Sequence, residues 1–304
     1  MDAFLDRYSV TVTAMLLKNK KWFRESVDSP DFGEQLKHIT MTLPEIKSEG
    51  VYEIAATSLV GRADPAFHVV KWLGPEYPTI IYHHGNNEHP FDYGFASKNT
   101  FKSIVLARKD LFAANIINLR APFHNSGMKF YLKKIGELSY FTAMLSVSVK
   151  LVEMLVQNFK RQGCGKVIVA GISLGGWVTN LHRSYYNSAQ VYLPIFAGAA
   201  LDELFLTSCY KKLAGDLVRE NPDRIKNILN FETAFKRVKT ENVFPLLARF
   251  DQIIEFNRQK QCYSQESISV IDKGHITGTL ASTQLRNHIL THLDKQVLNQ
   301  QVMK

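Results

Sequence analysis

Short runs of apolar, β-branched residues alternate with longer segments of helical periodicity along most of the chain. The runs at residues 78–83 and 114–119 are apolar almost throughout, as expected for strands that are buried on both faces of a sheet. The predicted strands are 51–60, 67–72, 78–83, 114–119, 166–170, 191–197, 243–249 and 268–271. The predicted helices are 4–23, 137–161, 174–186 and 279–297.

Strands that alternate with helices predict an α/β fold, in which a mainly parallel, twisted sheet carries helices on both faces. Sheets of this kind bind ligands at the carboxyl ends of their strands. A length of 304 residues fits a single such domain. Residues 1–50 contain no motif and are predicted to form an N-terminal helical extension, and residues 51–304 form the α/β domain. Within it, residues 201–241 are helical and mixed in charge.

Composition and charge exclude several classes of protein. With 45% hydrophobic and 21% charged residues, the chain is not a disordered tail, a collagen-like repeat or a coiled coil. Lys and Arg number 37 against 28 for Asp and Glu, and residues 101–170 hold 11 basic but 3 acidic residues. These charges are spread over several predicted elements without a nucleic-acid motif, so no nucleic-acid partner is expected. The basic residues indicate a solvated surface, or else one that meets an anionic substrate or a membrane surface.

The cysteines, the start of the chain and the most apolar segment bear on compartment and membrane. Three widely spaced cysteines without CxxC spacing argue against a disulfide framework and a structural zinc. Asp2 and Asp6 stand where a secretory signal needs positive charge, so a cytoplasmic location is expected. Residues 138–156 include Lys150 and Glu153, which favours a buried helix over a membrane span. The cysteines are Cys164, Cys209 and Cys262.

A candidate nucleophile follows the predicted strand 166–170. The run Gly171-Ile172-Ser173-Leu174-Gly175 matches G-x-S-x-G, with a strand directly before it and a helix directly after. A serine on such a sharp turn takes strained backbone angles and projects its hydroxyl at a helix N-terminus, where an oxyanion is favoured. The alternative is a glycine-rich turn with an incidental serine.

Ser173 needs a general base, and four histidines follow it in the sequence. His182 falls within a predicted helix, and His288 and His292 lie in the last helix, where packing or surface roles are expected. His275 follows the strand 268–271 through a short loop, so it is the favoured base.

The base needs an orienting carboxylate at another strand end. Asp251 follows the strand 243–249 and is the favoured acid. Asp202, which follows the strand 191–197, is the rival, because an acid on a neighbouring strand end can reach the same imidazole.

The strand 78–83 ends in His83-His84-Gly85-Asn86-Asn87, where backbone N–H groups can turn toward a reacting carbonyl. A metal site is the competing interpretation, but adjacent residues of a strand point to opposite faces and no metal-binding spacing occurs. We therefore expect no metal and assign the histidines a role in bracing the loop. The residues weighed as ligands are His83, His84, His89, Asp92 and His124.

Taken together, these positions resemble the α/β-hydrolase superfamily over roughly residues 51–297. The resemblance is carried by the elbow around Ser173, the chain order Ser173, Asp251, His275, the turn His84-Gly85 and the alternation of strands and helices. It implies a serine hydrolase with these three residues as a catalytic triad, a carboxylic ester or thioester as substrate, and no cofactor. It also implies that 201–241 is a cap that covers the serine and selects substrates.

The resemblance further implies an oxyanion hole made by the N–H of Leu174 and a second N–H near Gly85 or Asn86, although asparagines replace the glycines of the HGGG form. Arg120 and His124 lie beside the expected nucleophile and are candidates for contacts with an anionic or lipid-like acyl substrate, with an internally paired Arg120 as the alternative. Acyl transfer, peptide cleavage and a non-catalytic binding role remain alternative functions.

Overall fold

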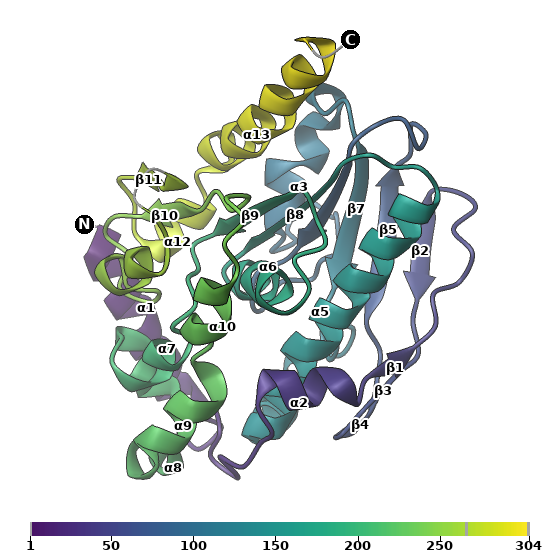
Figure 1. Ribbon diagram of the computed structural model, residues 1–304. Coiled ribbons are helices and arrows are strands. Elements are labelled where there is room, and N and C mark those ends of the chain that lie inside the picture. The colour runs from purple at the N-terminus through teal and green to yellow at the C-terminus, as the bar shows by residue number, and fades with distance from the viewer. Residues whose placement is uncertain (1, 265–266, 303–304) are drawn as a thin grey trace.

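An eight-stranded twisted sheet forms the centre of the protein (Figure 1). The computed structural model describes residues 2–264 and 267–302, with side chains as far as Leu293. The strands are β2 (Gly50–Glu53), β5 (Ala66–Lys71), β6 (Thr79–His83), β7 (Asn115–Arg120), β8 (Val167–Ile172), β9 (Val191–Ile195), β10 (Leu246–Ala248) and β11 (Ser269–Ile271). They lie in the order β11-β10-β9-β8-β6-β7-β5-β2.

The sheet is mainly parallel. β11, β10, β9, β8, β6 and β7 run parallel to one another, whereas β5 pairs antiparallel with both β7 and β2 at the edge of the sheet. His83 at the end of β6 lies opposite Gly171 near the end of β8. The loops that follow these two strands therefore begin side by side, at the edge of the sheet where ligands bind.

Helices cover both faces of the sheet, which confirms the predicted fold class (Figure 1). α5 (Leu138–Arg161) and α6 (Leu174–Tyr185) pack on one face, and α3 (Thr100–Ile104) and α13 (Ser282–Val302) pack on the other. Alternate residues of β8 enter the two cores: Val169 belongs to the first, and Ile168 and Ala170 belong to the second. Both kinds of position are apolar because neither face meets water.

Within the described residues, α5 is the helix that is long and apolar enough to span a membrane. Of its most apolar window, 72% is buried inside the protein. In this structure α5 is thus a core helix, packed against α6 and β8.

The predicted strand 51–60 is wrong as a single element. Its first part is β2, and its second part is β3 (Ala56–Ser58), which joins β1 (Thr40–Met41) and β4 (Gly61–Ala63) in a separate sheet. The backbone leaves the main sheet at Ile54, whose N–H donates to the carbonyl of Pro65 at 3.0 Å. Gly61, with φ +95°, then allows the tight turn between β3 and β4.

The two terminal helices also differ from the prediction. α1 (Asp2–Leu17) ends well before residue 23, because Lys18 takes a left-handed φ of +48°. Beyond it, Trp22 is buried and its backbone N–H donates to the carbonyl of Leu213 at 2.8 Å. The predicted helix 279–297 corresponds to α13, which begins at Ser282, and a separate short helix, α12 (His275–Thr279), precedes it. The first 50 residues are therefore packed onto the rest of the chain through α1, Trp22 and α2 (Phe32–Lys37).

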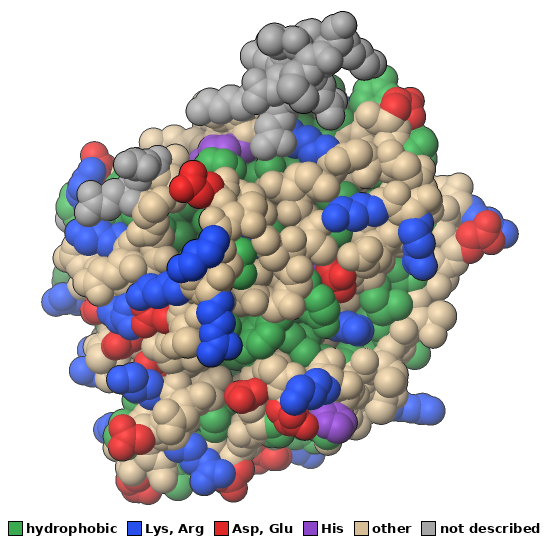
Figure 2. Space-filling view, viewed as in Figure 1, with side chains coloured by type: hydrophobic (Ala, Val, Ile, Leu, Met, Phe, Trp, Pro, Cys, Tyr) green, Lys and Arg blue, Asp and Glu red, His purple; other side chains and the backbone are tan. Residues whose placement is uncertain are grey.

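Residues 201–241, the insertion, form a run of short helices between β9 and β10. Figure 2 shows basic and acidic side chains intermixed over this part of the surface, around α8 and α9 in the view of Figure 1. The helices of the insertion are α7 (Asp202–Leu206), η2 (Cys209–Leu213), α8 (Asp216–Glu220), α9 (Pro222–Leu229) and α10 (Glu232–Arg237). The other helical segments are η1 (Leu106–Leu111), α4 (Met128–Lys134), α11 (Phe256–Gln259) and η3 (Lys260–Cys262).

Candidate active site

Ser173 occupies a strained turn between β8 and α6. Its backbone angles are φ +54° and ψ −109°, a region that a non-glycine residue enters only when the surrounding structure holds it there. Its N–H donates to the carbonyl of Ile195 at 2.8 Å, which fixes the turn against β9. The strand-turn-helix setting expected for the G-x-S-x-G match is therefore present.

The two glycines of the motif are required by close backbone approaches. A Cβ atom at Gly171 would lie 2.3 Å from the carbonyl oxygen of Gly175, and one at Gly175 would lie 2.1 Å from that of His83. Neither oxygen belongs to a flexible side chain that can move aside. The turn can therefore pack against the end of β6 only if both positions lack a side chain.

The structure brings Ser173, His275 and Asp251 together in one chain of hydrogen bonds. His275 Nε2 lies 3.1 Å from Ser173 Oγ, and His275 Nδ1 lies 2.7 Å from Asp251 Oδ2. Asp251 is 3% exposed and His275 is 8% exposed, whereas Ser173 is half-buried. This arrangement allows the imidazole to take the serine proton while the carboxylate orients the ring.

Two further hydrogen bonds hold the Asp251 carboxylate. Its Oδ1 accepts from the N–H groups of Ile253 at 2.8 Å and Ile254 at 2.7 Å, which leaves Oδ2 for His275. Burial raises the pKa of Asp251, although the attraction of His275 and the N–H of Ile254 oppose that rise. A carboxylate bonded at both oxygens is held in the orientation that the histidine needs.

The environment of His275 favours its charged form. Burial acts to lower the pKa of His275, but the Asp251 carboxylate outweighs it, with a further contribution from Asp6, so the pKa lies above the ordinary value. The Phe196 ring packs 5.8 Å from the imidazole. The Asp251 carboxylate therefore stabilises the imidazolium form of His275.

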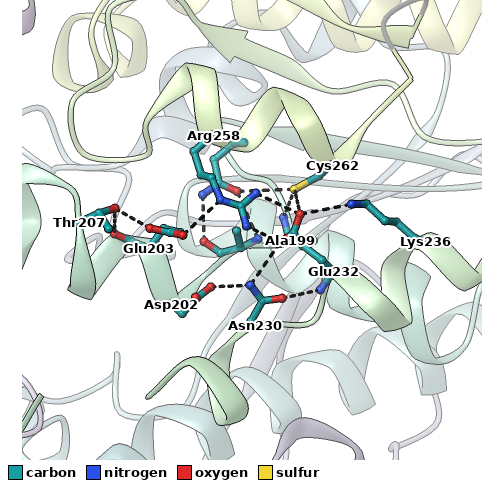
Figure 3. A network of polar contacts seen from close by, with 11 residues as sticks. Ala199, Asp202, Glu203, Thr207, Asn230, Glu232, Lys236, Arg258 and Cys262 are labelled. Atoms are coloured by element: carbon teal, nitrogen blue, oxygen red, sulfur yellow. Dashed lines mark hydrogen bonds and ion pairs between the residues drawn. The ribbon is translucent and has the colours of Figure 1, made fainter. Parts of the chain in front are cut away.

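The rival acid, Asp202, lies in a different network (Figure 3). Its Oδ1 accepts from the side chain of Asn230 at 2.9 Å, and burial together with the nearby charge of Glu203 raises the pKa of Asp202 to about 6. In the same network Arg258, on α11, contacts Glu203 and Glu232 of the insertion. Asp202 thus joins two segments within the insertion, and Asp251 is the acid in contact with His275.

Of the backbone N–H groups expected to bind an oxyanion, one already has a hydrogen-bond acceptor within the fold. The N–H of Gly85 is already used, because it donates to Glu88 Oε1 at 3.1 Å. Among the described residues the N–H of Asn86 has no acceptor, and Leu174 opens α6, where N–H groups lack helical partners. The structure therefore favours Asn86 over Gly85 as the partner of Leu174.

The side chain of Asn86 is held between two tyrosines. Tyr131 donates its hydroxyl to Asn86 Oδ1, and the phenol of Tyr210, on η2, also interacts with this side chain. Cys209, the neighbour of Tyr210, donates its N–H to the carbonyl of Gln252 at 3.2 Å. The insertion thus reaches both the Asn86 loop and the loop that carries Asp251.

Arg120 and His124 are both engaged within the fold. The Arg120 guanidinium contacts the Glu53 carboxylate and the carbonyl of Asp64, which matches the alternative of an internally paired arginine. His124 Nδ1 donates to the carbonyl of Pro122 at 3.1 Å, and burial lowers the pKa of His124 to about 4. Its Nε2 atom is buried without a hydrogen-bond partner in the described structure.

His84 braces the loop after β6. Its Nδ1 donates to the carbonyl of Gly85 at 2.6 Å, and its Nε2 accepts from the N–H of Ala121 at 3.0 Å. Burial, with the charges of His124 and His83, holds the pKa of His84 well below the ordinary value, so the ring is neutral at pH 7. Over the described ranges, no three His, Cys, Asp or Glu side chains are grouped as a metal ion would require.

Sequence reasoning missed Asp6 and Glu88. Asp6 lies on the buried face of α1, and its carboxylate accepts from backbone N–H groups beside Asp251 and His275. Its signal in the sequence is an acidic residue four positions before buried Val10, on the same helix face. Glu88 accepts from the N–H groups of Gly85 and Thr100, a loop arrangement with no sequence signal.

Comparison with known proteins supports the fold and matches part of the chain to a family. The family described as alpha/beta hydrolase domain containing 18 matches residues 117–241, and no curated protein matches the chain. Acetyl xylan esterase 1 from Thermoanaerobacterium sp. JW/SL YS485 has a TM-score of 0.54 at 14% identity, over 90% of this chain and 98% of its own. The Pyrococcus furiosus esterase Pf2001 has a TM-score of 0.52 at 11% identity, over 84% and 98%.

A Pyrococcus horikoshii acylaminoacyl peptidase has a TM-score of 0.52 at 16% identity, over 80% of this chain. The present chain covers only 40% of the length of that peptidase. At these identities the solved structures bear on the fold. The sheet order, the elbow at Ser173 and these similarities show that the chain has the α/β-hydrolase fold, and its residues 117–241 match an alpha/beta-hydrolase family.

Proposed function

We propose that the protein is a serine hydrolase that cleaves a carboxylic ester or thioester through an acyl-enzyme intermediate. The observation that carries this proposal is the contact of His275 with both partners, 3.1 Å to Ser173 Oγ and 2.7 Å to Asp251 Oδ2. A structural serine has no need of a strained turn and of a buried imidazole-carboxylate pair at its hydroxyl.

In the proposed reaction, Ser173 Oγ attacks the acyl carbon while His275 Nε2 takes the hydroxyl proton. The N–H groups of Leu174 and Asn86 stabilise the oxyanion that forms. The tetrahedral intermediate then expels the alcohol or thiol, which receives the proton from His275. Water attacks the acyl-enzyme in the same manner, losing its proton to His275, and the acid product leaves as Ser173 regains its hydrogen.

The insertion at 201–241 is proposed to act as the cap that selects the acyl substrate. η2 contacts both loops that border Ser173, through Tyr210 at Asn86 and through Cys209 at Gln252. A small acyl substrate, anionic or lipid-like, is proposed to enter beside this segment. Arg120 is left out of the substrate contacts, because Glu53 already occupies its guanidinium.

Peptide cleavage and acyl transfer use the same three residues, and the similar solved structures include both esterases and a peptidase. A turnover screen separates these reactions. It compares p-nitrophenyl esters from acetyl to palmitoyl, acyl thioesters and acylated peptide p-nitroanilides, each with and without an alcohol acceptor. We expect ester or thioester hydrolysis to be fastest; faster anilide cleavage or preferential transfer to the acceptor would redirect the assignment.

Ser173→Ala is the matched loss-of-function variant in that screen, and Ser184→Ala is its control. Ser184 lies on the same helix, where its hydroxyl donates to the carbonyl of Asn180 at 2.8 Å. We expect Ser173→Ala to lower turnover by at least about 10³-fold and Ser184→Ala to leave it near the wild-type value. Equal turnover in the two variants would reject the serine mechanism.

A further inference from the structure

Asp6 is a fully buried carboxylate on the N-terminal helix, far in the sequence from the residues of the triad. It is 0% exposed. A buried charge is costly unless hydrogen bonds compensate it. Three backbone N–H groups do so here: Asp6 Oδ2 accepts from His275 at 2.8 Å and from Gln252 at 3.1 Å, and Oδ1 accepts from Ile276 at 3.0 Å.

The three donors lie on two different segments. Gln252 directly follows the triad acid, and His275 is the triad base itself, so one carboxylate links the loop of Asp251 to the helix of His275. Each of these segments contributes one side chain to the triad, and His275 Nδ1 lies 2.7 Å from Asp251 Oδ2. A shift of either segment would change that distance and the 3.1 Å contact from His275 to Ser173.

Packing alone does not explain why α1 lies here. Asp6 and Val10 are its buried residues, while Phe4, Tyr8 and Leu16 on the helix are exposed. Around Asp6, polar contacts dominate, because the Arg7 guanidinium also donates to Gln252 Oε1 at 2.6 Å and 3.0 Å. The helix is thus attached to the acid loop by two consecutive side chains.

Gly274 makes the approach of α1 possible. A Cβ atom at this position would lie 2.9 Å from Asp6 Oδ2 and 2.9 Å from the carbonyl oxygen of Asp2. The absence of a side chain immediately before His275 therefore leaves the space that the Asp6 carboxylate occupies.

We propose that Asp6 is a positioning residue of the active site, whose carboxylate holds the Asp251 loop and the His275 helix in the register that catalysis requires. Helix α1 then contributes to the geometry of the active site and is not a dispensable extension. This inference rests on the proposed hydrolase function. A misplacement of about 1 Å at a catalytic group costs on the order of 100-fold in rate, so loss of the Asp6 hydrogen bonds has a measurable consequence.

The first test compares Asp6→Asn with Val10→Ala, a control on the same helix that removes buried apolar packing but no polar group. Ester turnover gives kcat and KM, and the end-point of fluorophosphonate labelling gives the fraction of folded sites. For Asp6→Asn we expect kcat to fall about 10- to 100-fold with KM and the labelled fraction little changed. For Val10→Ala we expect kcat per labelled site to match the wild type. A lower labelled fraction with unchanged kcat per site in Asp6→Asn would overturn the proposal.

The second test does not depend on hydrolysis. Amide hydrogen exchange at His275 and Ile276 is expected to be slow in the wild type, at least 10-fold faster in Asp6→Asn, and unchanged in Val10→Ala. Gly274→Ala, which displaces Asp6 without altering its charge, is expected to give the same fast exchange. Exchange that is unaffected by Asp6→Asn would overturn the proposal. If the wild type fails to label or turn over any ester, the hydrolase function fails, whereas the exchange rates still decide whether Asp6 holds the two segments.

Discussion

The serine side and the histidine side of the candidate active site are built in different ways. On the serine side, the residues from Gly171 to Gly175 are contiguous in sequence and carry the chain from β8 through the turn at Ser173 into α6. On the histidine side, Asp6, Asp251 and His275 come from three segments that are distant in the chain. The first side is fixed by backbone geometry, and the second is fixed by buried hydrogen bonds.

This difference determines how each side fails. A change in the serine turn meets backbone atoms that cannot move, so it disturbs the fold together with the site. A change on the histidine side removes a hydrogen bond or a charge but leaves the sheet intact, so it alters the rate before it alters stability. Four predictions follow this contrast, in order of decreasing effect.

Asp251→Asn should have the largest effect of the four, a decrease in kcat. The amide cannot stabilise the imidazolium and favours the wrong tautomer of His275, so kcat is expected to fall by about 10⁴-fold. Asp202→Asn is the control, because Asp202 contacts Asn230 in the insertion. The measurement is ester turnover of both variants, and near-normal kcat in Asp251→Asn would remove it from the triad.

Gly175→Ala should have a large effect on stability. The new Cβ would lie 2.1 Å from the carbonyl oxygen of His83, so the elbow must shift against β6. We expect the free energy of unfolding in urea to fall by about 1–3 kcal/mol or more. Gly165→Ala is the control, since nothing lies within 4 Å of its Cβ. Equal stability of the two variants would contradict the rigid serine side.

Arg120→Ala should affect stability more than turnover. Its side chain is 9% exposed, and its guanidinium is bonded to Glu53 and to the carbonyl of Asp64. Removing the guanidinium leaves that carbonyl without its donor. We therefore expect the free energy of unfolding in urea to fall by about 1–3 kcal/mol. The ratio kcat/KM for neutral and anionic esters should change little. A selective loss with anionic esters would restore Arg120 as a substrate contact.

The pH dependence should show the smallest effect. Because the pKa of His275 is raised and only the neutral ring accepts the serine proton, kcat/KM should rise with pH through a midpoint above the ordinary histidine value of about 6.5. The other ionisable groups at this side are Asp251, Asp6, Cys209 on η2 and Arg7 on α1. Removing the charge of Asp6 in Asp6→Asn should lower the midpoint. A wild-type midpoint below the ordinary value would contradict this electrostatic account.

The parts that sequence could predict are those with local causes. Hydrophobic periodicity predicts the buried strands β6 and β8 and the helices on both faces of the sheet. The short motif G-x-S-x-G predicts the turn at Ser173. The placement of Asp251 and His275 followed from the rule that strand ends converge, and the contacts of both residues agree with it.

The parts that escaped prediction depend on contacts between distant segments. Apolar alternation continues through residues 51–60, so it gave no sign that the backbone leaves the main sheet at Ile54. The N–H of Gly85, an expected oxyanion donor, is instead bonded to the side chain of Glu88, three residues later. The link from Asp6 to His275 spans 269 positions, and a helix pattern shows only that Asp6 faces inward, not what it meets.

Covalent labelling of the wild-type protein with a fluorophosphonate probe tests the central claim most directly. Peptide mass spectrometry after labelling locates the modified residue. The account predicts one phosphonate per folded molecule, attached to Ser173, and no adduct in Ser173→Ala at the same probe concentration. A modification at another residue, or labelling that persists in Ser173→Ala, would show that the hydroxyl at the strained turn is not the nucleophile.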